Sequence, residues 1–286
     1  MEWLKKHWRL AAVVLVAVYF ALQIWSEANL TDDANMLVFL LSEWFLLLAL
    51  LVLAFGRIEG GLRAIGMDPG KGLKLYLPGA AVGAGMFLVF VAVALLFGGY
   101  RIGVNPLGVN WLMILLFLIG FVGQSALEEV LMRGLLYYWL KKKLGPLGAV
   151  LLTAILFSLI HIPNGHTTSL SILNIALVGI FYGLLVIRTG SLWMACGAHF
   201  AWNFLETNVF LVPNSGNAVS TGIFKLTPLA ENELLIGKEF GPEGSLTVTI
   251  IHLIAIAFVA YGLYRQKPMA EPLVEAPLQD QNLSSN

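Results

Sequence analysis

The sequence predicts an all-α, polytopic membrane protein with about eight transmembrane helices. Of its 286 residues, 58% are apolar and only 12% are charged, and the mean hydropathy is +0.82. A soluble domain usually carries about 25% charged residues, so lipid must solvate most of the surface of a chain this apolar. Apolar runs also recur at lengths near the roughly 20 residues that a helix needs to cross about 30 Å of hydrocarbon.

These apolar runs divide the chain into membrane segments and connecting segments. The predicted spans are residues 10–25, 35–55, 75–98, 111–127, 147–161, 170–187, 192–210 and 246–264. We therefore expect three N-terminal helices (1–110), a central core of four helices (111–210), an irregular outer loop (211–245), a last helix (246–267) and a tail (268–286). The tail is polar and contains proline, which predicts disorder.

Positive charge is distributed unevenly between the connecting segments. With a cytoplasmic N-terminus, thirteen lysines and arginines fall in cytoplasmic segments and three in outer segments. This positive-inside asymmetry predicts that both chain ends lie in the cytoplasm. The chain carries no organelle address, so we expect the plasma membrane, with the functional site reached from the cytoplasmic side.

Charge balance and cysteine content exclude several protein classes. Lys and Arg number 17 and Asp and Glu also number 17, so no basic surface points to nucleic acid. The single cysteine, Cys196, cannot form an internal disulfide or build a cysteine-rich zinc module. The lipid bilayer is the one partner that the composition itself implies.

The fourth predicted span ends in a group of charged residues. Placing one ionisable side chain inside the bilayer costs on the order of 2.5–3.5 kcal/mol, so such residues usually have a partner or a function. Glu129 and Arg133 are four residues apart, which places them on one helix face and predicts a buried ion pair. Glu128 is rotated about 100° from Glu129 and has no such partner nearby. We therefore expect Glu129 and Arg133 to support the helix and Glu128 to be free to titrate.

Two further spans carry polar residues one helical turn apart. Phe157 and His161 close the fifth span, and His199 and Asn203 lie on the seventh. An antiparallel hairpin around residues 144–146 would place Glu128 and His161 at similar depth. The sequence therefore predicts that a carboxylate, two imidazoles and an amide meet within the membrane.

These motifs resemble those of a known family. Glu128-Glu129-x-x-x-Arg133, Phe157-x-x-x-His161 and His199-x-x-x-Asn203 match, in order and spacing, the successive motifs of the CPBP family. This family comprises the CAAX-processing and bacteriocin-processing (Abi) intramembrane proteases, which are related to the type II CAAX prenyl endopeptidase. The resemblance covers roughly residues 111–210 and implies an intramembrane endopeptidase acting on a peptide or a lipidated, CAAX-type protein.

The resemblance also implies roles for individual residues. Glu128 with His161 would activate a water, and His199 with Asn203 would stabilise the tetrahedral oxyanion. The family has been described both as metalloproteases and as metal-independent glutamate proteases. Glu128, His161 and His199 could supply a three-ligand zinc site, so the sequence is compatible with a zinc cofactor as well as with metal-independent catalysis. The sequence does not determine the oligomeric state.

Two other functions use the same residues differently. A non-catalytic immunity or partner-binding protein of the same fold would retain the polar core, and a small transporter could use the buried acids as a proton relay. The complete set of Glu, two His and Asn favours the enzyme, and the lack of a recognisable inverted repeat disfavours the transporter. For Glu43, in the second span, we expect a place facing the cavity or a polar partner rather than a direct chemical role.

Overall fold

The computed structural model describes residues 7–29, 33–229 and 232–265, and the predicted tail 268–286 lies outside them. The structure is 76% helical. The long helices are α2 (Trp8–Asn29), α3 (Asp33–Arg57), α5 (Gly72–Leu96), α6 (Trp111–Glu129), α7 (Tyr137–Leu159), α8 (Ser169–Thr189), α9 (Trp193–Phe204) and α11 (Leu246–Arg265). The shorter elements are α4 (Gly61–Ala64), α10 (Glu233–Ile236), three 3-10 turns, η1 (Pro69–Lys71), η4 (Lys238–Phe240) and η5 (Pro242–Gly244), and two π-helical segments, η2 (Val130–Leu136) and η3 (Leu205–Val209).

The polytopic membrane character of the chain is confirmed. Five described segments are long and apolar enough to cross a membrane: Asp33–Arg57, Pro69–Leu96, Trp111–Leu159, Ser169–Thr189 and Leu246–Arg265. The 49-residue segment contains two helices, because Gly145 takes non-helical angles (φ 70°, ψ 171°) and the chain reverses there. Helices α2 and α9 cover predicted spans but are not among the five, so the count of eight stays a prediction.

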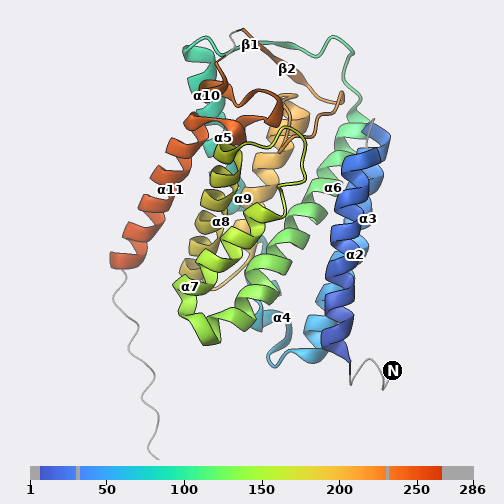
Figure 1. Ribbon diagram of the computed structural model, residues 1–286, viewed down its shortest axis with the longest axis vertical. Coiled ribbons are helices and arrows are strands. Elements are labelled where there is room, and N and C mark those ends of the chain that lie inside the picture. Colours follow the sequence, from blue (N-terminus) through green and yellow to red (C-terminus); the bar gives the residue numbers. More distant parts are fainter. Residues whose placement is uncertain (1–6, 30–32, 230–231, 266–286) are drawn as a thin grey trace, which may run out of the picture.

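The helices form a bundle whose two ends differ (Figure 1). We call one end the strand end, because it carries the two strands and α10. The opposite end holds α4 and the reversal of the chain at Gly145 within α7. We call this the lysine end, since Lys141, Lys142 and Lys143 lie directly before that reversal.

The strand end overturns two expectations from the sequence. Strand β1 (Tyr100–Val104) pairs antiparallel with β2 (Phe224–Pro228), so the fold is not purely α-helical. The predicted irregular loop 211–245 contains β2, α10 and two 3-10 turns, and it buries Leu226, Ile236 and Phe240. Five-residue strands show too short an alternation to be recognised, and their partners are more than 100 residues apart.

Local sequence signals explain where the core helices begin and end. The Asn110 side chain accepts a hydrogen bond from the Met113 amide at the start of α6. Thr168 and Ser171 form a capping box at the start of α8, and Gly190 ends that helix in the left-handed region. The first cap fixes the start of α6, on which Glu128 and Glu129 lie.

Small residues bring α5 against α9. A Cβ atom added at Gly79 or Gly83 of α5 would overlap the backbone of Met194 or Ala198. Only glycine permits this approach, and the contact holds α9 with the histidine at position 199 in the centre of the bundle.

Candidate active site

The four residues predicted to be catalytic line one cavity. Glu128 comes from α6, His161 follows α7, and His199 and Asn203 come from α9. The cavity measures about 90 Å³, and a single water needs only about 10–15 Å³ of such space. The structure therefore brings the set together beside room for several waters, while the roles of the residues stay predictions.

Glu128 is held by a neighbour that the sequence analysis missed. Its side chain is buried, and Oε1 accepts a hydrogen bond of 2.7 Å from Nε2 of Gln124, one turn earlier on α6. The Gln124 Oε1 atom in turn accepts from Nδ2 of Asn203 at 3.1 Å. Gln124 therefore connects the carboxylate to the amide, and its spacing of four residues from Glu128 was the available signal.

His199 lies between two carboxylates. Its Nδ1 is 3.0 Å from Oε1 of Glu129, and its Nε2 is 3.6 Å from Oε2 of Glu128. A carboxylate only accepts hydrogen bonds, so Nδ1 donates to Glu129 and Nε2 is turned toward Glu128. Glu129 thus orients the imidazole, a role beyond the helix support expected from the sequence.

The predicted ion pair between Glu129 and Arg133 is confirmed. Nη1 of Arg133 is 2.9 Å from Oε1 of Glu129, and both side chains are 1% exposed or less. The guanidinium also lies 4.2 Å from the centre of the Phe157 ring, a cation–π contact. One chain of contacts therefore runs from Arg133 through Glu129 and His199 to Glu128.

His161 has a defined orientation as well. Its Nδ1 lies 2.8 Å from the carbonyl oxygen of Phe157, to which it donates. This contact leaves Nε2 as the nitrogen with a lone pair. The Phe157 ring packs against the His161 ring at 4.8 Å between centres, so one phenylalanine contacts both the arginine and the histidine.

Both helices that carry the site continue into π-helical segments. Helix α6 runs into η2, which contains Arg133, and α9 runs into η3. Such segments are frequent at functional sites, because the wider turn changes the direction in which a side chain points. Here the wider turn still allows Arg133 to meet Glu129.

The zinc set that the resemblance implies, Glu128, His161 and His199, stays a prediction. Among the described residues, no group of three or more His, Cys, Asp or Glu side chains is arranged to hold a metal ion. Glu128, His161 and His199 line the same cavity without forming such a group.

Glu43 occupies a place that neither expectation described. The side chain is 0% exposed, and neither carboxylate oxygen has a hydrogen-bond partner within the described residues. It follows Leu40, which lines the cavity, by less than one turn of α3, yet it is not itself a lining residue. Glu43 is a buried acid beside the site.

A second carboxyl pair was not predicted. Nε1 of Trp202 donates to Oε1 of Glu243 at 2.8 Å, and Nδ2 of Asn214 donates to Oε2 of Glu206 at 3.0 Å. Both acids are buried, and Glu243 lines the cavity. Burial raises the pKa of Glu243. No local sequence pattern predicts that Glu243 lies at the cavity, because the 3-10 turn that carries it is positioned by contacts with distant segments.

The chain was compared with known families, proteins and structures. Residues 108–205 match the family model described as type II CAAX prenyl endopeptidase Rce1-like. No curated protein and no solved structure matches the chain. The matched segment includes Glu128, Glu129, Arg133, His161, His199 and Asn203. Residues 108–205 of this membrane protein are therefore similar to the Rce1-like type II CAAX prenyl endopeptidase family.

Proposed function

We propose that this protein is an intramembrane endopeptidase that cleaves a peptide bond with a water activated by Glu128. The observation that carries this proposal is the convergence of Glu128, His161, His199 and Asn203 on one cavity. The family match over the same residues supports it. The proposal includes eight spans with both ends of the chain in the cytoplasm.

Glu128 and His161 act on the water. Glu128 on α6 and His161 in the turn after α7 both line the cavity, and neither Oε2 of Glu128 nor Nε2 of His161 is the atom held by Gln124 or Phe157. The water gives one proton to Glu128 as its oxygen forms a bond to the carbonyl carbon of the substrate. The carbon–nitrogen bond then breaks, and the proton held by Glu128 passes to the leaving amine.

His199 and Asn203 stabilise the charge that develops on the carbonyl oxygen. In this role His199 carries protons on both nitrogens, with Nδ1 donating to Glu129 and Nε2 donating to the oxyanion. The Asn203 amide has two hydrogens, of which Gln124 takes one. The second hydrogen is available to the oxyanion. Loss of one such donor typically lowers kcat by about 10²–10³-fold.

The proposed substrate is a membrane-associated peptide or a lipidated, CAAX-type protein. Apolar side chains of Phe121, Phe157 and Ile160 line the cavity next to the polar set. Such walls exclude bulk water and accept apolar residues beside the cleaved bond. The family model that matches residues 108–205 is described as a type II CAAX prenyl endopeptidase, and we extend that substrate class to this chain as part of the proposal.

Mass spectrometry of cleavage in ¹⁸O-labelled water tests the proposal. Purified protein in detergent is incubated with a mixed peptide library, and each new carboxyl terminus should gain one ¹⁸O. A parallel sample is stripped with a strong chelator, and unchanged cleavage is the result expected for water activation by Glu128 alone. Loss of cleavage on stripping, restored by zinc, would overturn the metal-independent chemistry. Binding of peptides without cleavage would favour the non-catalytic binding protein.

A further inference from the structure

The cavity reaches from the centre of the bundle to the strand end. Its lining residues on α3, and Ile175 and Val178 on α8, come from the halves of these helices nearer that end, and Tyr182 lies just past the middle of α8. Its rim is built from the loop that follows α7 and the loop that follows η3. The rim residues are Asn164, Asn214, Ser215 and Asn217.

The rim is polar, uncharged and half-buried. Nδ2 of Asn164 donates to the carbonyl oxygen of Ser215 at 2.8 Å, which joins the two loops. The Asn214 and Asn217 backbones exchange hydrogen bonds of 2.8 and 2.9 Å. Amide side chains of this kind can donate to and accept from the backbone of an extended peptide. The rim therefore suits a peptide chain better than a charged small molecule.

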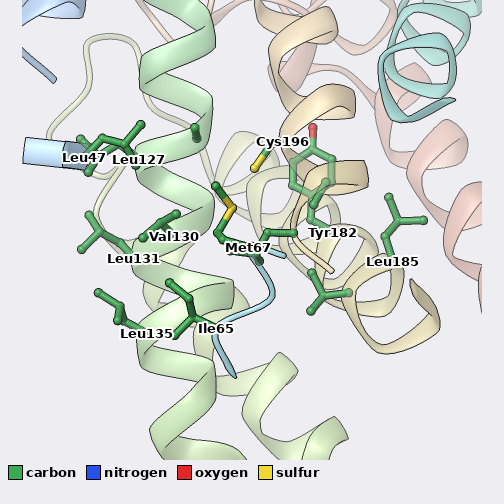
Figure 2. Close-up of a cluster of buried hydrophobic side chains, with 14 of the residues drawn as sticks. Leu47, Ile65, Met67, Leu127, Val130, Leu131, Leu135, Tyr182, Leu185 and Cys196 are labelled. Carbon is green, nitrogen blue, oxygen red and sulfur yellow. The ribbon is translucent and has the colours of Figure 1, made fainter. Parts of the chain in front are cut away.

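Buried apolar side chains pack together on the other side of the site, and Figure 2 shows part of this cluster. Ile65 and Met67, from the segment between α4 and η1, lie among buried residues of α6 and α8. The Gly66 carbonyl oxygen holds this segment in place by accepting from the Leu192 amide at 2.9 Å and from Oγ of Ser191 at 3.1 Å. A close-packed layer and the Glu129–Arg133 pair therefore separate the cavity from the lysine end.

The charges of the described residues identify the two ends. Arg101 and Lys225 lie on the two strands, and Lys238 lies in η4 beside them. The lysine end carries many more cations: Arg57, Arg63, Lys71, Lys74, Lys141, Lys142, Lys143, Arg188 and Arg265. An excess of lysine and arginine marks the cytoplasmic side, so the strand end faces away from the cytoplasm.

We infer that the active site is reached from the non-cytoplasmic side, and that the substrate is an extended peptide segment presented at that membrane surface. This inference rests on the proposed function, selects the membrane-associated peptide over the CAAX-type protein as substrate, and replaces the cytoplasmic access expected from the sequence. The peptide enters between the Asn164 and Ser215 loops, and its backbone pairs with the rim amides. A cytoplasmic carboxyl-terminal motif would have to pass the packed layer at the lysine end.

Cysteine accessibility tests the direction of the opening without requiring activity. Ile160→Cys places a thiol in the cavity wall, and Lys141→Cys is the matched control at the lysine end. The native Cys196 is only 1% exposed, so it should contribute little background. A small, charged, membrane-impermeant thiol reagent should label Ile160→Cys in intact cells and label Lys141→Cys only after permeabilisation.

The opposite labelling pattern would overturn the inference. Labelling of Ile160→Cys only after permeabilisation, or in neither condition, would show that the cavity does not open outward. Labelling of Lys141→Cys in intact cells would show that the whole chain is inverted.

A vesicle assay then tests the side from which substrate arrives. An impermeant peptide that is cleaved in detergent is added outside vesicles in which the strand end faces outward, and it should be cleaved at the detergent rate within about threefold. Cleavage only after permeabilisation would contradict outward access and leave the protease proposal standing. A wild-type protein that cleaves no peptide in detergent would instead contradict the proposed function, and the cysteine labelling would still decide the direction of the cavity.

Discussion

Replacing Arg133 with alanine should destabilise the folded protein more than any other single loss of charge at the site. The side chain is 1% exposed and contacts Glu129 at 2.9 Å, and its guanidinium lies over the Phe157 ring. Gly179 of α8 leaves room for Nη2, because a Cβ atom there would come within 3.0 Å of it. The substitution therefore removes a charge and opens a cavity in one step.

The expected magnitude follows from these contacts. Removing one member of a buried ion pair costs about 3–5 kcal/mol, because the other charge stays buried without its partner. Nε and Nη2 of Arg133 have no hydrogen-bond partner among the described residues, which favours the lower half of that range. For a chain of this size, 1 kcal/mol corresponds to about 2 °C in Tm, so Tm should fall by about 6–8 °C.

Thermal unfolding in detergent measures this effect, with a double substitution as the matched control. Glu129→Gln with Arg133→Met removes both charges and keeps most of the volume. This pair should recover at least half of the lost Tm, since no unpaired charge remains. An Arg133→Ala protein that unfolds within about 2 °C of wild type but has lost activity would refute the structural role. Arg133 would then act on substrate or in the chemistry.

Three further substitutions test neighbouring parts of the site. Gln124→Leu keeps the volume of the side chain but removes its hydrogen bonds to Glu128 and Asn203. Hydrogen bonds to charged groups are worth about 1.5–3 kcal/mol, so kcat should fall by about 10–100-fold while Tm changes by less than about 3 °C. An unchanged kcat would contradict the positioning role of Gln124. Glu43→Gln removes a buried carboxyl group that has no hydrogen-bond partner among the described residues. Tm should therefore stay equal or rise, and kcat should be unchanged. A large fall in Tm or kcat would contradict this and show that the carboxyl group of Glu43 makes a stabilising contact. Burial raises the pKa of Glu243 above its ordinary value, so the folded state binds this proton more tightly than the unfolded chain does. The bound proton adds to the free energy of unfolding at acidic pH, and this contribution is lost as the pH rises through the raised pKa. Glu243→Gln should therefore make Tm less dependent on pH between acidic and neutral buffer, and an unchanged pH profile of Tm would contradict that assignment.

The sequence was sufficient for the helical core and for one ion pair because both depend on local spacing. Residues four apart on a helix share a face in any fold, so the Glu129–Arg133 contact could be predicted before the structure. The apolar runs fixed the membrane class in the same way. The turn near Gly145 was also predictable, because glycine and proline interrupt the helical pattern there.

The remaining features depend on contacts between distant segments. The strands pair residues more than 100 positions apart, and no local pattern selects such a partner. Glu243 enters the cavity only because Trp202 and the strand-end turns position it. The contact between Glu129 and His199 was missed for a similar reason: the helix spacing already gave Glu129 one partner and said nothing of a second from α9.

The turnover of Glu128→Gln, measured in detergent beside wild type and Glu43→Gln, tests the central claim most directly. Glutamine keeps the size of Glu128 and can retain the contact with Gln124, but it cannot take a proton from water. The account predicts that kcat falls by at least about 10²-fold, with Tm and peptide affinity close to wild type, while Glu43→Gln keeps the wild-type kcat. A folded Glu128→Gln protein that cleaves peptide at the wild-type rate would contradict it.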